Sequence, residues 1–283
     1  MAHCQGPRAN AKMAALRNDT GIRRTMDAPR HNPPPLPSAN ARPPEIGHAL
    51  GMIVLYFALQ VAIGLLAALL LGIAIGMVDP GAAMLAANFK TLLVMVVLLG
   101  DAAIMLWLTR RFWPPLWSRA QPPGFGFTTP TAAWCAVAAA IGLGMPWIGG
   151  WLTELLAHGH AVPQDIKQLG GDASLGFRIA LTLVVVSVGP LVEELLFRGV
   201  LLSALLRHLR AGWAIAISAA LFALAHLIDL HWLWYALPNL ALLGALLAWL
   251  RLRSGSLWPS VIAHGCNNLL AMAALFVSLH HTG

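Results

Sequence analysis

The stretch VGPLVEELLFRGVLL, residues 188 to 202, places two adjacent glutamates and an arginine in a run that is otherwise apolar enough to cross a membrane. A charge near the bilayer centre costs at least ~2.5 kcal/mol even on the most lenient insertion scale, so ionisable residues there indicate a functional site by default. Glu193, Glu194 and Arg198 are therefore the first candidate site residues, provided that the rest of the chain is embedded in a membrane.

The composition of the chain indicates its solvent. Of the 283 residues, 58% are hydrophobic and only 10% are charged, whereas about 25% are charged in a typical soluble domain. We therefore expect an integral membrane protein. The net charge of +7 does not indicate a nucleic-acid partner, because the basic residues lie in short loops and an N-terminal tail and form no basic stripe. Cys4, Cys135 and Cys266 are an odd and widely spaced set that forms no disulfide framework.

Two regions follow one another along the chain. Residues 1–45 are rich in Arg, Pro, Ala and Asn and have no apolar stretch that could form a core, which predicts a disordered, basic, Pro-rich tail. Residues 46–283 form the predicted transmembrane domain, with candidate spans near the ~20 residues that a ~30 Å hydrocarbon layer requires. These spans are roughly 47–77, 91–109, 131–152, 179–206, 213–230, 232–250 and 257–279. The predicted fold is an all-α polytopic membrane helix bundle of about seven transmembrane helices.

The flanks of the spans alternate in charge. The tail carries seven Lys or Arg, and further arginines follow the second, fourth and sixth spans: Arg110, Arg111, Arg119, Arg207, Arg210, Arg251 and Arg253. By the positive-inside rule, these four segments share the cytoplasmic side, which predicts a cytoplasmic N-terminus and an external C-terminus. Tryptophans lie at span ends, as interfacial aromatics do: Trp147, Trp151, Trp232, Trp234 and Trp258.

Polar side chains of catalytic type occur in three separate spans. Glu194 and Arg198 are four residues apart, neighbours on one helical face that can form an ion pair, and this leaves Glu193 free to point elsewhere. FALAH puts Phe222 one turn before His226, and HGCNN puts His264 one turn before Asn268. At 1.5 Å rise per residue, Glu193 and His226 each lie ~21 Å from the cytoplasmic end of their span, and Asn268 lies ~22 Å from Arg253. One convergent site is therefore geometrically allowed.

The three motifs EELLFR, FALAH and HGCNN resemble those of the CPBP family, the CAAX protease and bacteriocin-processing intramembrane peptidases also called Abi proteins. Their patterns are Glu-Glu-x-x-x-Arg, Phe-x-x-x-His and His-x-x-x-Asn. The resemblance covers about residues 180–275 in the family's order, which places a catalytic CPBP/Abi-like core at residues 178–276. It implies an enzyme, an intramembrane endopeptidase that hydrolyses a peptide bond of a membrane-associated or lipidated substrate.

The resemblance also implies roles for the site residues. Glu193 would be the general base that activates water, and His226 would orient that water. His264 and Asn268 would stabilise the oxyanion, while Glu194 and Arg198 would hold the helix geometry. Members are often described as metalloproteases, and Glu193, His226 and His264 could bind zinc with a fourth position left for water. Because the chain has no His-Glu-x-x-His pair, we favour glutamate-activated water without an obligatory metal, with a divalent ion such as zinc as the alternative.

Other classes of function stay open from the sequence. Buried Glu, His and Asp also occur in transporters and proton relays, although we find no internal repeat, and a catalytically silent membrane scaffold is a further alternative. The expected partners are the lipid bilayer and a peptide or lipidated protein, with no nucleic acid. The composition is typical of a bacterium of high genomic GC content, so we expect the inner, cytoplasmic membrane.

Asp101 is an ionisable residue that the three motifs do not include. It lies in the second span ~13 Å from Arg110, and Arg198 lies ~13 Å from Arg207 on the same per-residue rise. Ionisable groups in membrane helices usually pair with one another or face a wet cavity. The sequence therefore predicts either an ion pair between Asp101 and Arg198 or a protonated or hydrated carboxyl in the substrate cavity.

Overall fold

The structure is a computed structural model that describes residues 42–75, 83–158, 173–228, 230 and 232–282. Every regular element in these residues is helical, which confirms the predicted all-α class. Residues 1–41 of the predicted tail lie outside the described residues. The α-helices are α1 (Ile46–Ile75), α2 (Ala83–Phe112), α3 (Ala132–Ala157), α5 (Leu175–Glu194), α6 (Leu202–Leu205), α7 (Ala211–Ala225), α8 (Leu237–Ser254) and α9 (Trp258–Thr282).

Six helical segments of the described chain are long and apolar enough to cross a membrane. Five of them coincide with most or all of α1, α2, α3, α8 and α9, and the sixth is the continuous run Leu175–Leu205 that joins α5 to α6. The protein is therefore an integral membrane protein built as a polytopic helix bundle. The fifth predicted span, 213–230, is different, because α7 has only 15 residues and gives way at His226 to a turn. At 1.5 Å per residue α7 is ~22 Å long, short of a ~30 Å hydrocarbon layer.

The sixth predicted span also begins later than expected. The prediction placed its start at residue 232, whereas α8 begins at Leu237, after a short 3₁₀ helix over Trp234–Ala236. Pro238 occupies the first turn of α8, where its missing N–H is tolerated but where a preceding helix could not continue unbroken. The helix ends at Gly255, whose φ of +68° is the left-handed conformation that glycine adopts most readily.

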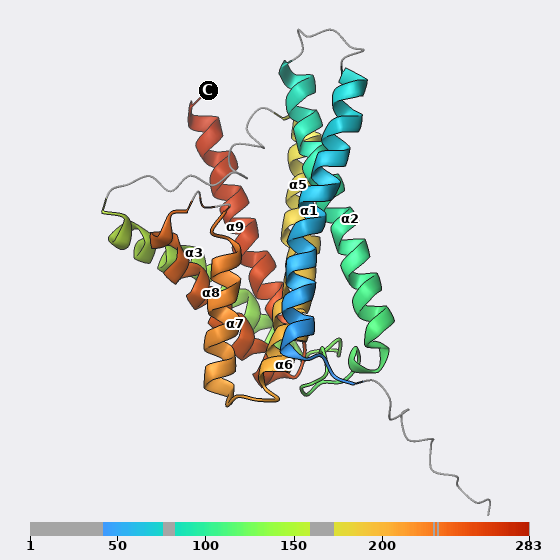
Figure 1. The fold of residues 1–283 in the computed structure, drawn as a ribbon. Coiled ribbons are helices and arrows are strands. Elements are labelled where there is room, and N and C mark those ends of the chain that lie inside the picture. The colour runs from blue at the N-terminus through green and yellow to red at the C-terminus, as the bar shows by residue number, and fades with distance from the viewer. Residues whose placement is uncertain (1–41, 76–82, 159–172, 229, 231, 283) are drawn as a thin grey trace, which may run out of the picture. The chain divides into compact units, whose positions relative to one another are not determined.

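The C-terminal ends of α2, α6 and α8, which carry or precede the basic residues Arg110, Arg207 and Arg251, lie at one end of the bundle (Figure 1). Arg207, after α6, donates to the carbonyl of Pro44 just before α1. The loop between α2 and α3 meets the turn between α8 and α9, where Leu257 N–H donates to Gly126 O and Thr128 Oγ1 donates to Gly255 O. We call this the basic end. That it faces the cytoplasm stays a prediction of the positive-inside rule.

The segment that carries the two glutamates forms the centre of the packed core. Every residue from Glu194 to Leu205 is buried, and its apolar side chains join a cluster with residues of α1, α2, α7 and α8. A helix that is apolar all round belongs in the interior of a bundle. This central position surrounds the charged groups of the segment with protein on all sides.

Helix α9 packs unusually close to α5, and a proline creates the opportunity. Pro190 has no N–H to give to the carbonyl of Val186, four residues earlier in α5. Gly265 of α9 approaches that carbonyl so closely that a Cβ atom at position 265 would overlap it. Asn268, one turn further along α9, donates from Nδ2 to the neighbouring carbonyl of Val185 at 3.1 Å. These contacts set the position of His264 beside the glutamates.

Candidate active site

The chain changes helical geometry directly after the two glutamates. Residues Leu195–Leu201 form a π-helix, so that Arg198 lies within it and Glu193 and Glu194 are the last residues of α5. A π-helical segment inside an α-helix is rare and is frequent at functional sites. The sequence pattern gave no indication of it. The wider turn sets the direction of the glutamates relative to the apolar residues that follow.

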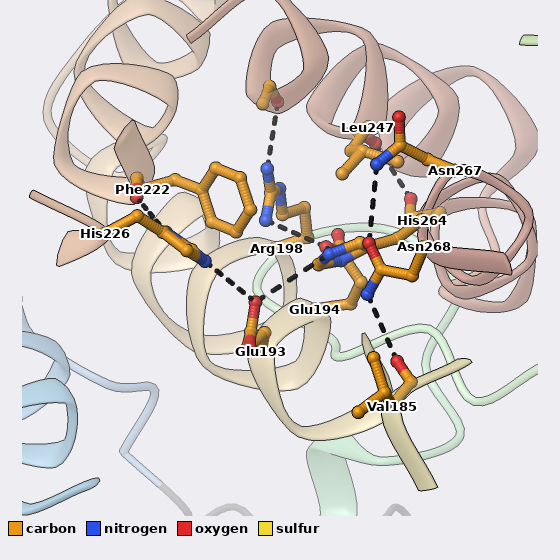
Figure 2. A network of polar contacts seen from close by, with 12 residues as sticks. Val185, Glu193, Glu194, Arg198, Phe222, His226, Leu247, His264, Asn267 and Asn268 are labelled. Carbon is orange, nitrogen blue, oxygen red and sulfur yellow. Dashed lines mark hydrogen bonds and ion pairs between the residues drawn. The ribbon is translucent and has the colours of Figure 1, made fainter. Parts of the chain in front are cut away.

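Glu193 lies between two imidazole rings that come from different helices (Figure 2). Its Oε2 is 3.7 Å from Nε2 of His226, at the end of α7, and 3.9 Å from Nε2 of His264 in α9. This oxygen is buried and accepts no hydrogen bond within the structure. The three atoms therefore surround a point at which a small polar species could bind all of them.

The other nitrogen of each ring makes a short hydrogen bond that fixes its orientation. Nδ1 of His226 lies 2.8 Å from Phe222 O. Since a carbonyl can only accept, this nitrogen carries the hydrogen, and Nε2 of a neutral ring then presents a lone pair to Glu193. Nδ1 of His264 lies 2.9 Å from Oε1 of Glu194, so this ring also turns Nε2 towards Glu193. Both rings are thus arranged by contacts behind the site.

Glu194 and Arg198 form a fully buried ion pair that extends to His264. Arg198 Nη1 donates to Oε1 of Glu194 at 2.9 Å, and both side chains have no exposed surface. The same oxygen accepts a hydrogen bond from Nδ1 of His264. Arg198 Nη2 donates to the carbonyl of Gly244 in α8 at 3.2 Å. A buried charge is tolerated only when it is paired and hydrogen-bonded. The cluster therefore links α5, α8 and α9 through one carboxylate.

Phe222 fills the space between the charged cluster and the histidines. The guanidinium of Arg198 lies 4.3 Å from the centre of the Phe222 ring, a cation–π distance. The rings of His226 and His264 lie 4.7 Å and 5.6 Å from the same ring centre. The phenylalanine of the FALAH motif thus excludes water from the ion pair and supports both imidazoles.

Asn268 lies beside this group, and its amide already makes two hydrogen bonds. Nδ2 donates to Val185 O, and Oδ1 accepts from Nδ2 of Asn267 at 3.3 Å. One N–H of the Asn268 amide is left for another acceptor. Asn268 therefore joins the site as a potential donor that is held by α5.

One cavity of about 370 Å³ is lined by Glu193, His226, His264 and Asn268. Its volume is within the range of small-ligand sites. Further lining comes from α1, α2 and α8 and includes Tyr56, Phe57, Gln60, Val94, Leu98 and Leu240. Most of these side chains are apolar. The polar groups thus lie on the wall formed by α5, α7 and α9, in a cavity otherwise suited to an apolar chain.

The structure brings five of the six candidate residues together in two connected groups, and Asn268 lines the same cavity as Glu193 and both histidines. Glu193, His226 and His264 surround one point, and Glu194 and Arg198 lie directly behind His264. The bond between Glu194 and His264, the acceptor Gly244 and the role of Asn267 were not predicted from the sequence. Helical spacing reveals neighbours on one helix, whereas these contacts join different helices.

The spacing of the donors provides a test for a metal ion. Ligands ~2.0–2.1 Å from a tetrahedral zinc lie only about 3.4 Å apart, and Oε2 of Glu193 is 3.7 Å and 3.9 Å from the two nitrogens. No group of His, Cys, Asp or Glu in the described part of the chain is set to hold a metal ion. Two atoms ~2.8 Å from one water can lie up to ~5 Å apart, so both separations fit a bridging water.

Asp101 is buried. Of the two environments predicted for it, the ion pair with Arg198 is wrong. Arg198 is bound to Glu194 and Gly244, and neither carboxylate oxygen of Asp101 makes a hydrogen bond within the structure. The polar side chain beside Asp101 is the Gln60 amide of α1, and Gln60 also lines the cavity. An equal depth in the membrane does not imply the same direction around a helix.

Residues 175–270 match the family model described as type II CAAX prenyl endopeptidase Rce1-like. The matched segment contains all three motifs and all six candidate residues, which confirms the resemblance drawn from them. No curated protein and no solved structure matches the chain.

Proposed function

Since residues 175–270 match the family model of the Rce1-like type II CAAX prenyl endopeptidases, we propose that Glu193 activates a water molecule for peptide-bond hydrolysis inside the membrane. The family establishes a CAAX-type intramembrane protease in general, and the choice of base and of substrate is our proposal. The observation that carries it is the buried Oε2 of Glu193, which has no hydrogen bond and lies 3.7 Å and 3.9 Å from two imidazole nitrogens.

In the proposed first step, one water lies between Glu193 and His226. Glu193 Oε2 takes a proton from this water while the water oxygen bonds to the carbonyl carbon of the scissile peptide bond. The carbonyl π electrons move to its oxygen and form an oxyanion. The second hydrogen of the water can be held by the lone pair on Nε2 of His226, which the bond from Nδ1 to Phe222 O directs towards the water.

In the second step, the oxyanion collapses and the carbon–nitrogen bond breaks. The bond electrons remain on nitrogen, which receives the proton held by Glu193, so the products are a carboxylic acid and an amine. The free N–H of Asn268 and, when its ring carries both protons, Nε2 of His264 would stabilise the oxyanion between these steps. Donors fixed in a water-poor site are effective stabilisers of developing charge. Glu194 and Arg198 support this arrangement through Nδ1 of His264.

The proposed substrate is a peptide of a membrane-associated or lipidated protein. Side chains from six helices line the cavity that contains Glu193, and most of them are apolar. Such a cavity suits a peptide chain that enters from lipid. A metal is not assigned to the mechanism, because Oε2 of Glu193 lies 3.7 Å and 3.9 Å from the two imidazole nitrogens, further than two ligands of one zinc ion lie from each other.

The test compares membrane peptides from cells that contain the wild-type protein with those from cells that contain Glu193→Gln. The substitution keeps the shape of the side chain and removes the base. We expect a peptide or precursor whose processing requires Glu193 and is lost in the variant, although the variant accumulates in the membrane to the wild-type level. Unchanged processing by Glu193→Gln would exclude Glu193 as the base.

A further inference from the structure

The helices of the bundle differ widely in length. Helices α1 and α2 each have 30 residues, or ~45 Å at 1.5 Å per residue. Helix α7 has 15 residues and α8 has 18, or ~22 Å and ~27 Å. All four have one terminus at the basic end. Figure 1 shows the other ends of α7 and α8 well below those of α1 and α2.

Four exposed tryptophans surround the far ends of the short helices. Trp147 and Trp151 lie on α3, and Trp232 and Trp234 lie in the connection between α7 and α8, with exposed fractions between 62% and 76%. We call these four residues the tryptophan rim. A tryptophan ring prefers the headgroup level of a bilayer to either water or hydrocarbon, because it is amphipathic. Four such rings at one place indicate a membrane boundary.

Packing contacts place the two halves of the rim at one level. Gly149, between Trp147 and Trp151 in α3, lies directly against the side chain of Asn239 in the first turn of α8. Helix α3 also contacts the 3₁₀ helix Trp234–Ala236. From Asn239 to the end of α8 at Ser254 there are 15 residues, or ~22 Å. The rim thus lies ~22 Å from the basic end, measured along either α7 or α8.

The opposite side of the bundle presents a much taller apolar surface. Large apolar side chains of α1 are exposed from Leu50 to Ile73, a height of ~35 Å at 1.5 Å per residue. Typical hydrocarbon is ~30 Å thick, and a mismatch is met by local thinning or thickening at fractions of a kcal/mol per Å. A flat bilayer cannot match ~35 Å on one side and ~22 Å on the other.

We propose that the tryptophan rim binds the lipid headgroup layer and thins the bilayer along the side formed by α3, α7 and α8. The partner is the interfacial layer of the membrane itself. The inference rests on helix lengths and exposed tryptophans and is independent of the proposed catalytic function. It has a consequence for that function, because His226 is the residue that ends α7. The thinned side brings water and headgroups to the level of the catalytic cavity, which in a flat bilayer would lie deep in hydrocarbon.

Spin-label accessibility in liposomes tests the proposal without a substrate. Cys4, Cys135 and Cys266 are replaced by alanine, and single cysteines are introduced by Trp147→Cys, Trp151→Cys or Trp234→Cys. Trp232 is left intact because its φ of +65° makes substitution a backbone perturbation. The matched control is Val61→Cys on α1, which is exposed to lipid and lies 15 residues, ~22 Å, from the start of that helix.

The expected result is a contrast between two sides at one height. Labels on the rim should collide with a water-soluble nickel complex severalfold more, relative to oxygen, than the label at Val61. Rim labels that collide mainly with oxygen, as Val61 does, would overturn the proposal, since the rim would then lie in hydrocarbon. Free access of the nickel complex to Val61 would overturn it too, because the bilayer would then end at that level all round. Each labelled variant must first unfold at the temperature of its unlabelled parent.

Discussion

Gly244 is the position at which one added methyl group tests the link between the ion pair and the site. A Cβ atom at Gly244 would lie 3.1 Å from Cα of Ala219 and 3.3 Å from Nη2 of Arg198. Carbon atoms in good contact are ~3.5–4.0 Å apart, so α8 must move from α7 by ~0.5 Å. The 3.2 Å hydrogen bond from Arg198 Nη2 to Gly244 O would then lengthen to ~3.7 Å, beyond hydrogen-bond range.

The energetic effect of Gly244→Ala follows from three terms. Slight overpacking costs ~1 kcal/mol, and loss of a hydrogen bond from a charged donor costs ~1.5–3 kcal/mol. The better helix propensity of alanine returns up to ~1 kcal/mol. The net loss of ~2 kcal/mol should lower Tm by ~4–8 °C in a chain of this size. Turnover should fall by about tenfold, because small displacements of positioned catalytic groups are costly and Arg198 holds Glu194 behind His264.

The assay measures thermal unfolding in detergent and, in liposomes, cleavage of the peptide whose processing requires Glu193. Gly144→Ala is the matched control, since a Cβ atom at this helical position of α3 has nothing within 4 Å. This control should keep full turnover and unfold at the wild-type temperature or slightly above it. If Gly244→Ala behaves as Gly144→Ala does in both measurements, the contact between Gly244 and Arg198 does not support the site, and the reasoning is refuted.

Three further predictions separate chemistry from structure. Glu194→Gln should lower Tm as well as activity, because it leaves the buried Arg198 without its counter-ion at a cost of ~3 kcal/mol or more, whereas Glu193→Gln should lose activity at unchanged Tm; equal Tm values for the two variants would contradict this distinction. Purified enzyme should keep its turnover after exhaustive chelation, since the donor spacing is too wide for one zinc; stoichiometric metal whose removal reversibly stops turnover would show that the site contracts around an ion. Asp101→Asn should leave Tm unchanged or raise it, because neither carboxylate oxygen makes a hydrogen bond and burial of an unpaired carboxylate is costly; a clear fall in Tm would reveal a stabilising partner.

Hydropathy and per-residue rise were sufficient to predict the bundle and the convergence of its motifs. Both depend on one coordinate, the height along a helix, which can be counted from the sequence. Glu193, His226 and His264 were placed near one depth by this count, and they meet in the structure. The same count failed for Asp101, because the direction of a side chain around its helix is set by packing between helices.

The end of α7 and the π-helix could not be predicted for a different reason. Apolar residues resume at Leu227 and Ile228 after the single His226, so hydropathy averaged over a span has no break where the helix ends at Ala225. The π-helix lies in a stretch that is buried on all sides, where no polar face marks the number of residues per turn. In both places the local conformation depends on tertiary contacts, and the composition stays the same.

The π-helix also bears on how this chain can change length in evolution. An i→i+5 segment within an α-helix holds one residue more than the α geometry requires. Deletion of a single apolar residue between Leu195 and Leu201 would let the segment relax to an α-helix and would leave the hydropathy of the span almost unaltered. The helices on either side of the segment would keep nearly their present relative orientation, because the deletion removes the residue that the wider turns hold in excess. Glu193 would still face the histidines in a protein that still inserts, so loss of one residue in this stretch should be tolerated more readily than loss of one residue elsewhere in the span.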